Sequence, residues 1–75
     1  MALKDWEKIE SRSSLPRWEH KEKNLVIFLS YTPIEKNHWQ VTLEKIGYFH
    51  EVIFESFEIS RAEAMKTITS LRRKY

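Results

Sequence analysis

Residues 38–58, HWQVTLEKIGYFHEVIFESFE, have the alternating pattern of two antiparallel β-strands joined at Ile46-Gly47. Gly47 is the only glycine of the chain, and glycine tolerates the positive φ angle that a two-residue hairpin turn needs. Such a turn pairs Leu43 with His50, and Trp39 with Phe54. We therefore predict a hairpin around which the rest of the fold is built.

This register divides the hairpin into an apolar and a polar face, because side chains alternate along a strand. The predicted apolar face carries Trp39, Val41, Leu43, Val52 and Phe54. The other face carries His38, Gln40, Thr42, Glu44, Phe49, Glu51, Ile53 and Glu55. An antiparallel sheet that is covered on one side has this division, so we expect another element to pack on the apolar face.

A C-terminal helix is predicted for residues 60–75, SRAEAMKTITSLRRKY. Ser60 and Glu63 have the spacing of a capping box. An apolar stripe at helical spacing is formed by Ala64, Met65, Ile68, Leu71 and Tyr75. We expect this stripe to pack on the apolar face of the hairpin.

Two further elements are predicted before the central hairpin. Residues 2–10, ALKDWEKIE, favour a short helix with Leu3, Trp6 and Ile9 on one side, which must dock to persist. Residues 17–31 favour a first hairpin, with an edge strand at 17–20, a polar turn at 21–24 and a strand at 25–31. The last strand is apolar on both faces, as in a central strand, and the N-terminal helix is expected to cover its second face.

The expected architecture is a single α+β domain over residues 1–75. It has a short N-terminal helix, an antiparallel meander of three to four strands and a C-terminal helix packed on one sheet face. The chain has no cysteine, which excludes disulfides and thiolate metal sites. No apolar run approaches the ~20 residues of a membrane span, and no signal peptide is visible, so a cytoplasmic protein is expected. One glutamine and two asparagines among many Glu and Lys lean towards a thermophilic source.

Charge is unevenly distributed along the chain, although the net charge is only +2. Residues 1–31 have a net charge of +1, residues 32–59 of −3 and residues 60–75 of +4. The last segment carries Arg61, Lys66, Arg72, Arg73 and Lys74 against Glu63. Any basic surface is therefore expected to be local to the C-terminal helix.

No catalytic constellation emerges from the sequence. His20, His38 and His50 lack the close spacing of a helix-borne metal pair. No set of nucleophile, base and orienting group can be assembled, because Ser13 and Ser14 have no base nearby and Ser60 serves as a helix cap. We therefore expect a non-enzymatic protein with no metal or cofactor.

Residues 57–75, FEISRAEAMKTITSLRRKY, resemble the end of the AP2-like, arm-type DNA-binding domains of phage-type integrases. Phe57, Ser60, Glu63 and Ala64 match the phrase that precedes the C-terminal helix in that family, and the resemblance implies DNA binding. The order helix, strands, helix is also similar to double-stranded RNA-binding domains, although Ser60-Arg61 stands where those domains have a lysine pair. Integrase-type domains present the sheet to DNA, where Glu44, Glu51 and Glu55 of this chain would repel phosphate.

Two functions are therefore expected. The first is nucleic-acid binding through phosphate contacts of the C-terminal helix and the first hairpin. It would use Arg61, Lys66, Arg72, Arg73 and Lys74, with Arg17, Lys21 and a partly exposed Trp18 that stacks on bases. The alternative is a protein–protein adaptor or homodimer that binds through Phe49 and Ile53 on the polar sheet face.

Overall fold

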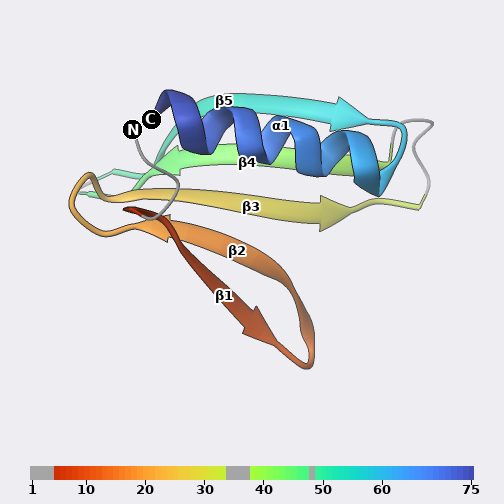
Figure 1. Cartoon of the computed structure of the whole chain (residues 1–75), viewed down its shortest axis with the longest axis horizontal. Coiled ribbons are helices and arrows are strands. Elements are labelled where there is room, and N and C mark those ends of the chain that lie inside the picture. Colours follow the sequence, from red (N-terminus) through yellow and green to blue (C-terminus); the bar gives the residue numbers. More distant parts are fainter. Residues whose placement is uncertain (1–4, 34–37, 48) are drawn as a thin grey trace.

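The computed structural model describes residues 5–33, 38–47 and 49–75, which form a single antiparallel sheet with a helix on one face (Figure 1). The elements are β1 (Glu7–Ser11), β2 (Ser14–His20), β3 (Leu25–Tyr31), β4 (Trp39–Lys45), β5 (Glu51–Glu58) and α1 (Arg61–Lys74). The strand order in the sheet is β1-β2-β3-β4-β5, so each strand pairs with its neighbours in the chain. The small α+β class is confirmed.

The predicted N-terminal helix is wrong, and so is the predicted number of strands. Residues 7–11 form strand β1, in which Lys8 lies opposite Trp18 and Ile9 lies opposite Arg17. Ile9 therefore points away from the core that Trp6 and Trp18 share, whereas a helical stripe would place Trp6 and Ile9 together. A nine-residue helix is marginal by itself, while β2 provides a full row of backbone hydrogen-bonding groups. The result is a five-stranded meander; Leu3 lies outside the described residues.

The central hairpin forms, but with a different register from the predicted one. Leu43 lies opposite Phe54 rather than His50, and Trp39 lies opposite Glu58 rather than Phe54. Residues 46–50 make a longer connection than the predicted two-residue turn. The slip of four residues is even, so Trp39, Val41, Leu43 and Phe54 keep the faces predicted for them. With this register β4 pairs along its whole length.

The predicted faces are wrong for Val52 and for Glu51, which lies opposite Lys45 on the α1 side. The register shifts between Leu43 and Glu44, so that Phe54 and Val52 lie opposite adjacent residues of β4. A bulge of this kind leaves Ile53 as the extra residue and turns the residues before it to the other face. Val52 is consequently 55% exposed.

The first hairpin is confirmed in outline. Its turn, residues 21–24, ends at Asn24, which has a positive φ angle of 56°. Among the described non-glycine residues, Asn24 alone has a positive φ. Asparagine tolerates this left-handed conformation, whereas Gly47 does not adopt the positive φ that was predicted for it. The predicted edge strand at 17–20 is wrong, because β1 pairs with β2 and makes it an internal strand.

The core lies between the sheet and α1, which runs along β4 and β5 (Figure 1). The helix buries Ala64, Ile68 and Leu71. The core residues that the strands contribute are Trp18, Leu25, Ile27, Leu29, Val41 and Leu43, with Trp39 and Phe54 at the margin. The predicted packing of the C-terminal helix on the apolar hairpin face is therefore confirmed.

Trp6 closes the core at the end of the sheet where α1 finishes. It is 5% exposed, and its indole Nε1–H donates a 3.0 Å hydrogen bond to the carbonyl oxygen of Arg72. Its ring also meets the ring of His20 edge-on at a centroid distance of 5.2 Å. Trp6 thus joins the start of the described chain to the last turn of α1, although a strand and not a helix follows it.

Candidate interaction surface

The sheet face opposite α1 is called here the open face. Among the described residues, no element other than the strands and their connections lies on it. The register places on it Glu7, Ile9, Arg17, Glu19, Val26, Phe28, Ser30, Gln40, Thr42, Glu44, Val52, Glu55 and Phe57. The N-terminal helix that was expected to cover this face is absent from the described residues, because residues 7–10 belong to β1. The open face is therefore available to another molecule.

The open face combines apolar side chains with negative charge. Phe57 is 46% exposed, while Val26 and Phe28 are more deeply placed on β3. Arg17 is the only arginine among the described residues of the open face. Its Nε donates a 2.9 Å hydrogen bond to Glu19 Oε2, so its positive charge is paired within the face. Glu44 and Glu55 remain on the β4 and β5 side, which bears no lysine or arginine on this face. This is an acidic surface with apolar patches, and it would repel a phosphate backbone.

The two edges of the sheet differ in how they are protected. β1 is five residues long, carries charged residues at most positions and has a register shift between Ile9 and Ser11. Short, charged and bulged strands are the usual means by which proteins prevent pairing at an edge. β5 also has a register shift and carries three glutamates, but it is eight residues long, contains no lysine or proline, and within the described residues pairs only with β4. β5 is therefore the edge at which another strand is able to pair.

Apolar side chains cluster along β5 and just beyond it. Val52, Phe57 and Ile59 are 55%, 46% and 67% exposed. Single exposed apolar residues are common, but several along one free edge are typical of a contact surface. The sequence signal for this surface is EVIFESFEI, residues 51–59, which places apolar residues on both faces of a strand that can bury only one.

A groove of ≈ 450 Å³ lies between β5 and α1. Its lining residues are Phe54, Lys66, Thr67, Ser70, Leu71, Lys74 and Tyr75. Phe54, Leu71 and Tyr75 supply its apolar surface, and Lys66 and Lys74 are exposed on the helix side. The groove runs beside the free edge of β5, so one bound polypeptide segment could contact the groove and the edge together.

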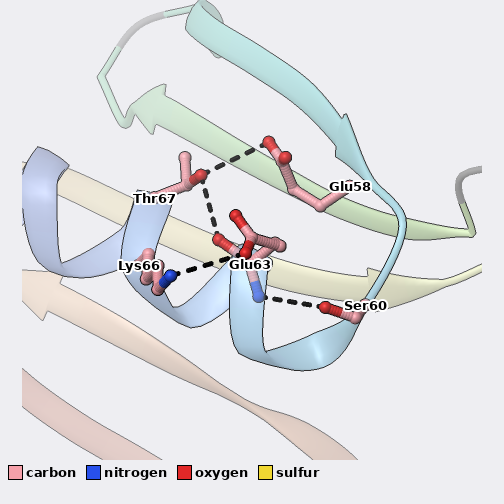
Figure 2. A network of polar contacts seen from close by, with 5 residues as sticks. All are labelled: Glu58, Ser60, Glu63, Lys66 and Thr67. Carbon is pink, nitrogen blue, oxygen red and sulfur yellow. Dashed lines mark hydrogen bonds and ion pairs between the residues drawn. The ribbon is translucent and has the colours of Figure 1, made fainter.

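Polar contacts attach the end of β5 to the first turns of α1, as Figure 2 shows. Ser60 Oγ accepts a 3.2 Å hydrogen bond from the Glu63 N–H, which confirms the predicted N-cap. Thr67 Oγ1 lies 3.3 Å from Glu58 Oε2 and 3.2 Å from the Glu63 carbonyl oxygen. Lys66 Nζ lies 3.5 Å from Glu63 Oε1. These contacts hold the last residues of β5 in a defined position relative to the groove.

Replacing Ser60 by alanine is expected to lower the free energy of unfolding by about 1 kcal/mol, because the helix loses its side-chain cap. Urea unfolding followed by circular dichroism measures the change. Ser60→Asp is the matched control, since aspartate also caps a helix and is expected to keep nearly all of the stability. Equal losses in the two variants would show that the hydroxyl does not act as a cap.

The predicted basic residues of α1 lie in different environments. Lys66 and Arg73 are seven residues apart, about two helical turns, and lie on the outward side of α1. Arg61 has its guanidinium carbon 5.9 Å from the centre of the Trp39 ring. Arg72 is half-buried, and burial lowers the pKa of its guanidinium. Lys74 Nζ lies 5.5 Å from the centre of the Tyr75 ring.

The structure places the predicted residues of the first hairpin in different environments. Arg17 lies on the open face, on the other side of the sheet from α1. Lys21 Nζ lies 3.5 Å from Glu7 Oε2. Lys23 approaches the helix end, where its Nζ donates to the Tyr75 carbonyl oxygen at 3.1 Å. The prediction of a partly exposed Trp18 is wrong: it is 1% exposed in the core, so stacking on bases would require the core to open.

The residues predicted for a protein partner are both exposed, but the structure separates them. Ile53 lies in β5 and is 38% exposed, at the bulge. Phe49 lies in the β4–β5 connection, not on the sheet, and is 84% exposed. The surface considered for a protein partner therefore still includes β5. Its main exposed apolar residues are Val52, Phe57 and Ile59 rather than Phe49 and Ile53.

The histidines lie in different environments. His20 is buried, and its Nδ1 accepts a hydrogen bond from the Lys23 N–H at 3.3 Å. His38 stacks edge-on with Tyr31 at 5.4 Å between ring centres, and His50 Nδ1 is 3.9 Å from Glu44 Oε1. In the ranges that the structure describes, no three histidine or acidic side chains are grouped so as to share a metal ion.

Comparisons with protein-family models, with curated protein sequences and with solved structures found no match. The helix α1 and the remaining described segments include no helix of the length and apolar character needed to cross a membrane.

Proposed function

We propose that this chain is a non-enzymatic protein-binding module whose contact surface is β5 and the adjoining part of the open face. The observation that carries the proposal is the free edge of β5, eight residues long and lined by Val52, Phe57 and Ile59. A long edge strand with several exposed apolar side chains lowers solubility unless a partner pairs with it. The attached groove along α1 adds a second contact area to the same surface.

Electrostatics favours a protein over a nucleic acid as the partner. The open face carries Glu44 and Glu55 beside β5, where phosphate would be repelled. The cations of α1 are distributed around the helix, and Lys66 is close to Glu63. Phosphate contact at the helix end, near Arg73 and Lys74, stays the competing explanation; Lys74 also lines the groove, whereas Arg73 does not.

The test is capture of partners from nuclease-treated extract of the cells that make this protein. We expect wild-type protein to retain a protein that Phe57→Lys loses, because a lysine at this site breaks the apolar contact at the centre of the surface. Leu15→Lys is the matched control: Leu15 is 36% exposed on β2, away from β5, and its substitution is expected to leave capture unchanged.

Two results would contradict the proposal. One is that Phe57→Lys and Leu15→Lys retain the same proteins as the wild type. The other is that only nucleic acid is retained from untreated extract and that Arg73→Glu with Lys74→Glu abolishes this retention. The second result would assign the function to the basic helix end.

A further inference from the structure

The structure assigns a specific kind of partner to β5: an extended segment that adds to the sheet as a sixth strand and alternates apolar with basic side chains. We infer that its apolar side chains enter the groove along α1 and its basic side chains extend over the open face towards Glu55. The inference deepens the proposed function and rests on it, since it names the chemistry of the partner at the same surface.

The backbone of β5 supplies the first part of the argument. At the edge of a sheet, every second residue presents its N–H and C=O outward, and an added strand satisfies them. Contacts of Glu58 with Thr67 hold the strand end in place before any partner binds (Figure 2). An edge that is already ordered loses less conformational entropy on binding. β1 is a poor alternative, because it is five residues long against eight for β5.

The groove side of β5 selects apolar side chains. Phe54, Leu71 and Tyr75 line the groove, which at ≈ 450 Å³ is large enough for several side chains of an added strand. Lys66 and Lys74 also line it. Their positive charges disfavour a basic side chain at this position. Residues of the partner that point towards α1 are therefore expected to be aliphatic or aromatic.

The open side of β5 selects basic side chains. Glu55 lies on this face next to the free edge, opposite Thr42 of β4. Side chains directly opposite each other on neighbouring strands are about 4.5–5.5 Å apart at Cβ, so a lysine on the added strand would reach this carboxylate. Val52 and Phe57 lie on the same side of β5, where the aliphatic stem of a lysine packs on them while its ammonium group reaches Glu55. On the α1 side, Glu58 already contacts Thr67. Alternation along the partner then places its apolar residues towards α1 and its lysines over the open face.

The charge of β5 also argues against a second copy of this chain as the occupant. β5 contains Glu51, Glu55 and Glu58 and no lysine or arginine. Antiparallel pairing of two β5 strands would bring the three glutamates of each copy to one seam without a cation from either strand. Like charges across strands are destabilising, whereas a basic strand neutralises them.

The test uses synthetic peptides of eight residues, the length of β5. One alternates valine with lysine, a second alternates valine with glutamate, and a third has the composition of the first in two blocks, four valines then four lysines. We expect only the alternating valine–lysine peptide to shift the NMR amide signals of β5 and of Leu71 and Tyr75. Glu55→Lys is expected to weaken this peptide about tenfold or more and to favour the valine–glutamate peptide.

Glu22→Lys is the matched control, because it changes the net charge equally at an exposed position in the β2–β3 turn. It is expected to leave peptide affinity unchanged. N-methylation of the peptide at every second residue tests the backbone contact. Methylation of one alternate set is expected to abolish binding and methylation of the other to be tolerated, since only one set donates to β5.

Equal binding of the alternating and block peptides, equal loss in Glu55→Lys and Glu22→Lys, or equal effects of both methylated sets would overturn the inference. So would concentration-dependent dimerisation of the wild-type chain that shifts the amide signals of β5, because the occupant would then be a second copy. If a cellular protein is captured through Phe57 while no alternating peptide binds, the proposed function stands and the inferred partner chemistry is wrong. If neither occurs, both are wrong.

Discussion

Trp18→Ala is expected to lower the free energy of unfolding by about 3–5 kcal/mol, the cost of emptying a large buried aromatic site. Trp18 is 1% exposed and packs in the core with Trp6 and Ile27. A domain of this length has a total stability of roughly 4–11 kcal/mol, so the variant is expected to be largely or wholly unfolded at 37 °C. Urea unfolding followed by circular dichroism measures the change.

The control for Trp18 is Phe49→Ala, which removes an aromatic ring that is 84% exposed. Its effect is expected to stay within about 0.5 kcal/mol, as for most surface substitutions. The comparison separates a ring that builds the core from one that meets solvent. A change in Trp18→Ala as small as that in Phe49→Ala would contradict the buried position and return Trp18 to the list of surface aromatics available to a ligand.

Trp6→Ala is expected to cost about 3–5 kcal/mol for the same reason, although Trp6 lies outside every regular element. Trp6→Phe isolates one part of this effect, because phenylalanine retains an aromatic ring but lacks the indole N–H. Its expected cost is about 1–2 kcal/mol, since the Arg72 carbonyl oxygen loses a hydrogen-bond donor and the ring is smaller. Chemical unfolding gives both values.

Hydrogen exchange locates the Trp6 effect in the structure. The last turn of α1 and the end of β2 are expected to exchange faster in Trp6→Phe, because Trp6 contacts Arg72 and His20. In β4 and β5, hydrogen exchange is expected to accelerate only by the amount that the loss of overall stability causes. Uniform acceleration across the sheet, with no excess at residues 70–75, would show that Trp6 does not anchor the helix end.

The candidate interaction surface could be inferred from the sequence only in part. The acidic character of the open face follows from Glu44, which alternates with Leu43, and from Glu55, which alternates with Phe54. Glu51 was predicted for the same face but lies opposite Lys45 on the other one. The exposure of Val52 could not be foreseen, because it depends on a bulge that one extra residue in β5 creates. The groove beside Phe54 likewise exists only once α1 is placed along β5.

The sequence by itself determined the local elements whose signals lie within a few residues. The helix α1 begins at the cap supplied by Ser60, and β3 is the central strand that its apolar run predicts. The side of the hairpin that faces the core follows from its alternating residues. These signals are strong because capping, helical periodicity and strand alternation depend on neighbours in the chain.

Only the tertiary structure decided what residues 5–11 do, which register the hairpin takes and which aromatic rings are buried. A segment as short as EKIES has no strong preference of its own, and the edge of β2 provides hydrogen bonds that turn it into a strand. Trp18 is buried because this added strand makes β2 internal, and Trp6 is buried because α1 ends beside it. Contacts between residues far apart in the chain set these outcomes, and they exist only after the sheet and the helix have packed together.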